Sequence, residues 1–287
     1  MYGIIKRLNI EEKKMSKIVA FTNQKGGVGK TTTCVNLATY LAAYGKRVLL
    51  VDMDPQGNAT TGVGFEKTAE MLTFYDVITG EYKIEDVVKQ TSIKGLDIIP
   101  SNVDLAGAEI DLVQKEGREV VLKNQLELIQ SKYDYIFMDC PPSLGLITVN
   151  ALTATDTVII PIQCEFYALE GLSQLMNTVR LVKQYYNSKI EIEGVILTMK
   201  DSRSNLVNQV ADEIKTFFGK LVYETVIPRN VRLAEAPSHG LPIYLYDSRS
   251  TGGIAYNNLA REFLRRNKDN GVLRDKRQIF KGDLNNE

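Results

Sequence analysis

The chain has 287 residues, of which 44% are hydrophobic, enough for one large α/β domain with a buried core. Its 35 basic residues balance its 35 acidic residues, which excludes an attraction of the whole molecule to nucleic acid. No stretch approaches the roughly 20 apolar residues of a membrane-spanning helix, and no cleavable leader is evident, so we expect a cytoplasmic protein. The isolated residues Cys34, Cys140 and Cys164 favour reduced core thiols over disulfides or a metal cluster.

The two ends of the chain are predicted to lie outside the folded domain. Residues 1–14 mix apolar and charged side chains and are expected to form a disordered leader. Because Met15 is itself a natural start, both a misassigned start and a functional extension stay open. The single domain is predicted to span residues 15–266, and the polar residues 267–287 to form a flexible tail.

A glycine-rich turn joins the first predicted strand, residues 18–21, to a predicted helix at residues 31–44. Glycines let successive backbone amides point inward, and a following helix directs its positive N-terminal end at an anion. This order predicts a nucleotide-binding loop made of Lys25, Gly26, Gly27, Val28, Gly29, Lys30, Thr31 and Thr32. We expect Lys30 to hold the β- and γ-phosphates and the Thr31 hydroxyl to ligate Mg2+.

The loop departs from the standard phosphate-binding pattern at its beginning. Gly-x-x-x-x-Gly-Lys-Ser/Thr requires a glycine where this chain has Gln24. The chain offers instead a second lysine, Lys25, at the start of the turn. The sequence therefore predicts a variant phosphate loop with one additional positive charge.

Acidic residues follow a second apolar strand, predicted at residues 48–51. Asp52 and Asp54 come at its carboxyl end, where open α/β sheets bind ligands. Asp54 is expected to position or polarise a water near the γ-phosphate, and Asp52 to serve Mg2+ through water. The alternative is that both carboxylates merely cap the loop.

The middle of the chain leads to a third acidic position. Residues 66–95 are predicted to be a polar, helical scaffold, followed by a strand at 96–99 and helices at 105–115 and 119–132. The next apolar strand, residues 133–139, ends in Asp139, directly before Cys140 and two prolines. This is typical of a Walker B aspartate, which holds Mg2+ in its second shell.

The remaining sequence repeats the alternation of strand and helix. The predicted strands are residues 158–161, 194–197 and 221–227, and the predicted helices are residues 168–186, 206–218 and 253–266. Alternating elements with right-handed crossovers predict a three-layer, doubly wound, mostly parallel α/β sheet.

Five motifs together resemble the ParA/Soj family of DNA-partitioning ATPases, which belongs to the deviant Walker A group of P-loop NTPases. They lie at residues 25–32, 52–58, 139–142, 165–172 and 228–238. The resemblance covers residues 15–266 and implies that ATP lies between two subunits, with Lys25 of one subunit reaching the phosphates bound by the other. It also places Asp54 at the hydrolytic water, so the implied catalytic residues are Asp54, Lys25 and Lys30.

The same resemblance assigns residues nearer the C-terminus. Pro228 and Asn230 are expected at the adenine, and Arg203 and Arg232 at DNA phosphates. Both arginines lie in or beside polar turns, where they can neutralise phosphates without reading bases.

The implied function is a slow ATPase switch that uses ATP and Mg2+. An ATP-dependent homodimer would bind nonspecific double-stranded DNA, and a ParB-type centromere-binding partner would stimulate hydrolysis. Such a protein would be cytoplasmic and nucleoid-associated, without stable membrane insertion.

Three alternatives use the same loop. A MinD-like cell-division-positioning ATPase would bind membranes through a C-terminal amphipathic helix, but residues 272–280 contain few apolar anchors. A reductase like the nitrogenase iron protein would need paired thiolates for an iron–sulfur cluster. A nucleotide-dependent kinase or ligase would need a separate substrate pocket, which the sequence does not identify.

Overall fold

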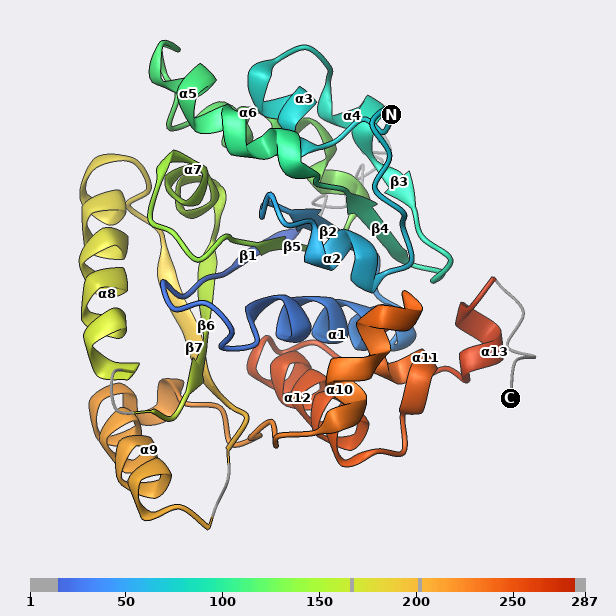
Figure 1. Ribbon diagram of the computed structural model, residues 1–287, viewed down its shortest axis with the longest axis vertical. Helices are drawn as coiled ribbons and strands as arrows, with labels where there is room; N and C mark the ends of the chain where they lie inside the picture. The colour runs from blue at the N-terminus through green and yellow to red at the C-terminus, as the bar shows by residue number, and fades with distance from the viewer. Residues whose placement is uncertain (1–14, 166–167, 201–202, 282–287) are drawn as a thin grey trace, which may run out of the picture.

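The computed structural model describes residues 15–165, 168–200 and 203–281. Within these residues, one seven-stranded sheet is covered by helices on both faces (Figure 1). The predicted three-layer, doubly wound, mostly parallel α/β fold is therefore confirmed. The leader predicted for residues 1–14 lies outside the described residues.

The sheet places the first strand near its centre. The strand order is β3-β4-β2-β5-β1-β6-β7, and only β3 runs antiparallel to its neighbour. The strands are β1 (Lys17–Phe21), β2 (Val48–Asp52), β3 (Lys89–Gln90), β4 (Leu96–Ile99), β5 (Tyr135–Asp139), β6 (Thr157–Gln163) and β7 (Glu191–Thr198). Because the other six strands are parallel, their carboxyl ends meet at one edge of the sheet.

Two separate hydrophobic cores hold the layers together, one on each face of the sheet. One face is covered by α3 (Phe74–Thr79), α4 (Ile84–Val87), α5 (Ala108–Val113), α6 (Val121–Ile129), α7 (Leu146–Ala154), α8 (Ala168–Tyr185) and α9 (Asn205–Phe218). The other is covered by α1 (Lys30–Ala43), α2 (Asn58–Gly62), α10 (Val231–Glu235), α11 (Ile243–Asp247), α12 (Thr251–Arg266) and α13 (Lys276–Ile279). Short 3-10 turns are η1 (Val103–Gly107), η2 (Gln130–Lys132), η3 (Gly219–Leu221) and η4 (Ala236–His239). Burial on both faces explains why β2 and β5 read as continuous apolar runs.

The helical scaffold predicted for residues 66–95 is confirmed only in part. This segment contains only α3, α4 and the two-residue strand β3. Thr73 and Asp76 form a capping box that begins α3, and Gly80 ends the helix in the left-handed conformation, with φ 84°. Strong local signals therefore stop the helix after two turns.

The strand predicted at residues 221–227 is also wrong. The segment runs beside β7, but its pairing is limited to isolated bridges, Val195 with Val222 and, just beyond both segments, Lys200 with Pro228. Between these bridges, the carboxylate of Glu262 on α12 accepts hydrogen bonds from the backbone amides of Glu224 and Thr225, both at 2.9 Å. These two amides are thereby withdrawn from the ladder, and a regular strand does not form.

Residues 267–281, which follow the predicted domain boundary at residue 266, pack against the domain, and residues 282–287 of the predicted tail lie outside the described residues. Asp269 accepts hydrogen bonds from Lys46 Nζ at 2.6 Å and from the Tyr135 hydroxyl at 2.7 Å. Ile279 is 1% exposed in the core beneath α13. Polar contacts fix the start of this segment, and one buried apolar side chain fixes its end. In the described part of the chain, no helix has the length and apolar character to cross a bilayer.

Candidate functional site

The glycine-rich turn lies at the carboxyl end of β1, between β5 and β6. Gly27 and Gly29 adopt φ angles of 73° and 84°, which favour glycine, and Gly29 is the N-cap of α1. The Thr198 hydroxyl at the end of β7 donates a hydrogen bond to the carbonyl oxygen of Val28 at 2.8 Å. The turn is thus fixed from outside and has the open helix N-terminus that a phosphate group requires.

Lys30 lies within this turn and is 6% exposed. Its Nζ donates to the carbonyl oxygen of Lys25 at 3.1 Å. Burial lowers the pKa of Lys30, while the nearby Asp139, Cys140 and Asp54 oppose that shift. The ammonium group is therefore held inside the loop by a weak neutral acceptor, which a phosphate oxygen can replace.

Lys25 has a different environment from Lys30. Its ammonium group forms an ion pair with the carboxylate of Glu165, which lies two residues beyond the end of β6. The two side chains are 36% and 46% exposed, respectively. The second lysine of the variant loop is therefore accessible at the surface and paired within its own subunit. Glu165 belongs to the sequence motif at residues 165–172, but no role was predicted for it.

Asp52 and Asp139 end neighbouring strands and are paired directly in the β2–β5 register. Both side chains are completely buried. Burial and the neighbouring Asp52 raise the pKa of Asp139, while Thr31 and Lys30 oppose that shift. Burial raises the pKa of Asp52 to about 6, although hydrogen bonds from Thr60 and the Asp54 amide lower it. The two carboxylates therefore oppose each other's ionisation.

The donor set at this position fits a magnesium ion. Neither carboxylate oxygen of Asp139 has a hydrogen-bond partner within the described residues, although both are buried. Asp139 is close enough to Thr31 for that side chain to lower its pKa. A hard divalent cation takes oxygen ligands and compensates buried carboxylates. Asp139, Asp52 and the Thr31 hydroxyl thus lie near one another, and their role as a metal site stays a prediction.

Asp54 lies in the loop that follows β2 and is 9% exposed. Its Oδ1 accepts a hydrogen bond from the Gln56 amide at 2.9 Å, and its own amide donates to Asp52 Oδ1 at 3.2 Å. Two further residues, Thr60 and Ser101, hold this loop in place, and sequence reasoning missed both. Ser101 follows strand β4 at the carboxyl edge of the sheet, and this position in the sequence could have indicated its role. Nothing in the sequence indicates the role of Thr60.

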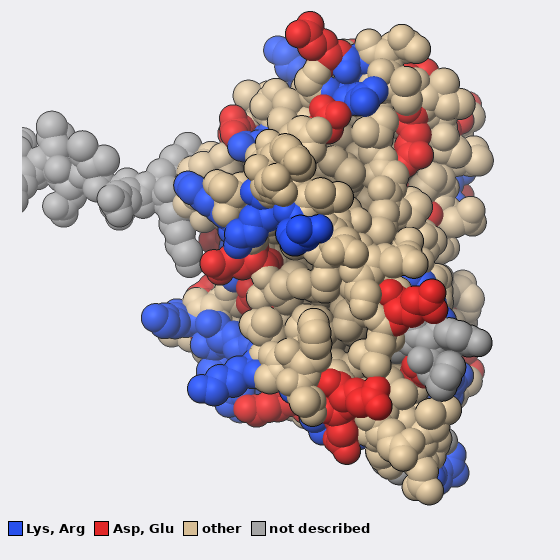
Figure 2. Space-filling model, turned by 90° about the vertical axis from the view of Figure 1, so that its left-hand side faces the viewer, with Lys and Arg blue, Asp and Glu red and all other residues tan. Residues whose placement is uncertain are grey.

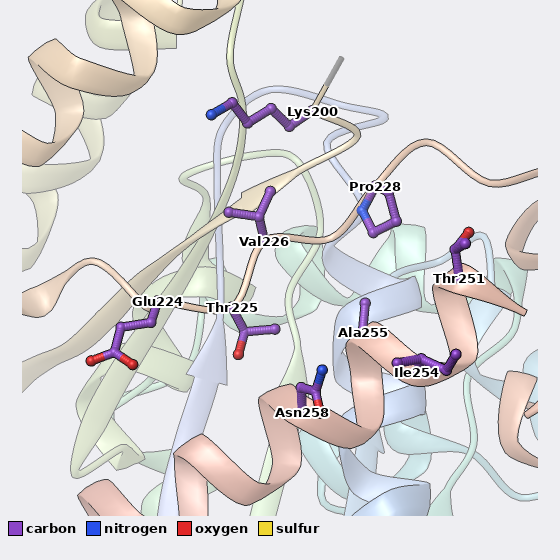
Figure 3. A pocket seen from close by; sticks show the side chains of 9 residues that line it. All are labelled: Lys200, Glu224, Thr225, Val226, Pro228, Thr251, Ile254, Ala255 and Asn258. Carbon is purple, nitrogen blue, oxygen red and sulfur yellow. The ribbon is translucent and has the colours of Figure 1, made fainter. Parts of the chain in front are cut away.

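Pro228 borders a groove with a cavity volume of about 610 Å3 (Figure 3). The groove lies between the segment beside β7 and helix α12, and its lining includes Val226, Pro228, Ile254 and Asn258. Asn230 is not part of this lining. Its side-chain amide donates to the Thr251 hydroxyl at 2.7 Å, and its side-chain oxygen caps α10. The structure therefore places Pro228 at a candidate base pocket and gives the Asn230 side chain a capping role.

The two arginines predicted to bind DNA are both exposed, Arg203 in a turn and Arg232 in helix α10. Arg203 follows Lys200, and the bridge between Lys200 and Pro228 brings its loop beside the segment that leads to Arg232. Arg232 is 51% exposed and pairs with Glu235 at 3.0 Å. On the face of the molecule that includes α8 and α9, acidic side chains lie among the basic ones (Figure 2). That face is not a continuous basic surface.

Comparisons with known proteins agree with this geometry. The family model described as an AAA domain matches residues 16–192. The chain is 60% identical over 248 residues to the sporulation initiation inhibitor protein Soj of Bacillus subtilis, covering 86% of this chain and 98% of that protein. It is 52% identical over 255 residues to the chromosome partitioning protein ParA of Caulobacter vibrioides, covering 88% and 96%. The structure of cobyrinic acid a,c-diamide synthase from Mycobacterium smegmatis with bound ADP and magnesium matches with a TM-score of 0.78 and 35% identity, over 88% and 96% of the two chains.

Proposed function

The chain belongs to the Soj/ParA family of chromosome-partitioning proteins, and from this premise we propose that it is an ATP hydrolase that partitions DNA. The observation that supports the proposal most is the meeting of two lysines and three carboxylates at one sheet edge. Lys25 and Lys30 lie at the glycine-rich turn, and Asp52, Asp54 and Asp139 follow two adjacent strands. That arrangement has the charges needed to hold a nucleoside triphosphate and its metal ion.

Nucleotide binding is assigned to the turn and the nearby groove. The amides of the turn and the Lys30 ammonium bind the phosphates, and the Thr31 hydroxyl, Asp52 and Asp139 hold Mg2+, the two acids through water. Bound there, Mg2+ neutralises negative charge on the β- and γ-phosphates. The adenine lies against the apolar side of the groove at Pro228. The matched structure with ADP and magnesium supports this assignment.

Hydrolysis is assigned to Asp54. One of its oxygens is occupied by the Gln56 amide, and the other makes no hydrogen bond in the described part of the chain. That second oxygen accepts a hydrogen bond from the attacking water and orients it toward the γ-phosphorus. The water oxygen forms the new bond to phosphorus as the bond to the ADP oxygen breaks, so the products are ADP and inorganic phosphate.

Dimerisation is assigned to Lys25. In the single subunit its charge is paired with Glu165, on a partly exposed surface. We infer that ATP draws it to the phosphates bound by a second copy, so that each triphosphate is neutralised from both sides. Because ATP then binds the dimer better than the monomer, ATP stabilises the dimer by mass action.

DNA binding is assigned to the ATP-bound dimer. A dimer presents two copies each of Arg203 and Arg232, which doubles the number of exposed arginines. Contacts between arginines and DNA phosphates do not depend on the base sequence. The proposal is a slow ATPase that binds nonspecific double-stranded DNA on the nucleoid and releases it after a ParB-type partner stimulates hydrolysis. The 60% identity to Soj, against 35% to the diamide synthase, favours this function over a ligase.

The test of this proposal is the oligomeric state with ATP, ADP and no nucleotide, measured by sedimentation. We expect a dimer with ATP alone. Lys25→Ala should keep most of its nucleotide affinity but stay monomeric, whereas the control Lys132→Ala, an exposed lysine paired with Glu85, should dimerise normally. An unmutated protein that is equally dimeric with ADP would refute the switch.

A further inference from the structure

Two buried hydroxyl groups connect the end of β4 to the loop that contains Asp52 and Asp54. Thr60 on α2 donates two hydrogen bonds to Asp52 Oδ2, from its amide at 2.8 Å and from its hydroxyl at 2.7 Å. Ser101, two residues after β4, donates its amide hydrogen to the Thr60 hydroxyl oxygen at 2.9 Å. Its own hydroxyl donates to the carbonyl oxygen of Asp54 at 2.8 Å. Thr60, Ser101 and Asp52 are all completely buried.

The direction of these hydrogen bonds follows from the groups involved. A backbone amide can only donate, so the Thr60 oxygen must accept from Ser101. The single hydroxyl hydrogen of Thr60 is then available to Asp52, which as a carboxylate can only accept. Ser101 therefore fixes the orientation of the Thr60 hydroxyl, and Thr60 fixes the orientation of the Asp52 carboxylate. Because the Thr60 hydroxyl accepts a hydrogen bond from Ser101, the hydrogen bond that it donates to Asp52 is strengthened.

Close backbone packing fixes the same loop at its far end. Gly57 has a φ of 60°, and a Cβ atom built on it would lie 2.7 Å from the carbonyl oxygen of Ser101. Only glycine avoids this contact. The Asp54 carbonyl also accepts from the Gly57 amide at 2.9 Å. Ser101 thus lies against both ends of the turn that presents the Asp54 side chain.

The arrangement separates the two acids. Thr60 acts on the side chain of Asp52, whereas the Ser101 hydroxyl acts on the backbone of Asp54. Each contact can therefore be removed without removing the other. Small displacements at a catalytic group are costly, since a shift of about 1 Å can lower a rate by roughly a hundredfold.

We propose that Thr60 and Ser101 are positioning residues for ATP hydrolysis, Thr60 aiming the Asp52 carboxylate at the metal ion and Ser101 setting the position of Asp54 at the water. The inference rests on the proposed function, because that function assigns the metal to Asp52 and the water to Asp54. The proposed function assigns neither positioning residue to the nucleotide or the metal ion. They act through the two acids, so the loss of Thr60 should change the Mg2+ requirement and the loss of Ser101 should change the rate of hydrolysis.

The experiment compares Thr60→Val, which keeps the shape and removes the hydroxyl, with Thr60→Ser, which keeps the hydroxyl. The Mg2+ concentration for half-maximal binding of a fluorescent, non-hydrolysable ATP analogue should rise roughly tenfold in Thr60→Val, as expected when a group that orients a metal ligand is lost. Thr60→Ser should restore it to within about twofold of the unmutated protein. Ser101→Ala should leave the Mg2+ requirement unchanged and lower kcat roughly tenfold, with little change in KM.

A matched control separates positioning from packing. Thr39 on α1 is completely buried, and its hydroxyl donates to the Val35 carbonyl of its own helix at 2.9 Å. Thr39→Val therefore removes one buried hydroxyl and should alter neither the Mg2+ requirement nor kcat. If Thr60→Val and Ser101→Ala behave like Thr39→Val and change only thermal stability, the inference is wrong. If the unmutated protein binds no nucleotide at any Mg2+ concentration, the proposed function itself fails, and the inference with it.

Discussion

Asp139→Asn tests the electrostatics of the site most directly. The side chain of Asp139 is completely buried beside Asp52, and neither of its oxygens has a hydrogen-bond partner within the described residues. The amide of asparagine has the same shape without the charge. We expect the variant to be more stable than the unmutated protein when nucleotide and Mg2+ are absent, because a buried charge without a partner is costly.

The neighbouring acid, Asp52, shows how the cost of ionising a buried carboxyl group depends on pH. Burial raises the pKa of Asp52 from 3.8 to about 6 despite three hydrogen bonds that lower it. An acid with a raised pKa costs the folded state nothing below its unfolded pKa, and the cost grows with pH until the raised value is reached. At 1.36 kcal/mol per pH unit, two units correspond to roughly 3 kcal/mol at pH 8, and about half of that at pH 5. Burial and the neighbouring Asp52 also raise the pKa of Asp139, so the cost of its ionisation has the same sign and also grows with pH.

The assay is urea unfolding with EDTA at pH 8 and at pH 5. Asp139→Asn should raise the free energy of unfolding at pH 8 by roughly 1 to 3 kcal/mol, the usual cost of leaving a buried polar group without a partner, and should raise it by less at pH 5. Asp212→Asn, on an exposed carboxylate of α9, is the control and should change neither value measurably. A variant that is less stable than the unmutated protein at pH 8, or a difference that does not depend on pH, would refute the reasoning.

Three further predictions concern the switch. Glu165→Gln should strengthen the ATP-bound dimer by roughly 2- to 30-fold in Kd, because neither subunit then has to break the ion pair between Lys25 and Glu165. Exposed ion pairs are worth about 0.2 to 1 kcal/mol each, and the dimer has two. Analytical ultracentrifugation would measure the change, and a weaker dimer would contradict the prediction. Asp54→Ala should trap an ATP-bound dimer and lower kcat at least a hundredfold, whereas phosphate release at the unmutated rate would remove Asp54 from the mechanism. Arg203→Ala combined with Arg232→Ala should abolish most ATP-dependent retention on DNA, and the salt dependence of any remaining binding should be shallower; unchanged retention in a filter-binding assay would show that these arginines are not the contacts.

Local signals in the sequence were sufficient for the six parallel strands and for the phosphate loop. The predicted strand at residues 96–99 coincides with β4, and the helix predicted at residues 31–44 is offset from α1 by one residue at each end. Buried parallel strands read as apolar runs wherever they occur, and glycine spacing identifies the loop. Because parallel strands end at one edge, the meeting of Asp52 and Asp139 could also be predicted.

What escaped prediction depends on contacts between distant residues. Helix α7 was missed because it is buried on nearly every side and has no polar face to give it a helical period. The segment at residues 221–227 has the apolar pattern of a strand, but two of its backbone amides donate hydrogen bonds to Glu262, which is far along the chain. Thr60 reaches Asp52 only because α2 folds back over the end of β2. Tertiary hydrogen bonds of this kind leave no local pattern.

Retention on nonspecific double-stranded DNA with ATP, with ADP and without nucleotide tests the central claim most directly. The account predicts retention with ATP alone, in step with the appearance of the dimer, and a steep loss of retention as salt is raised. The ADP-bound monomer should not be retained on the DNA. Equal retention of the ADP-bound monomer and the ATP-bound protein would contradict the account.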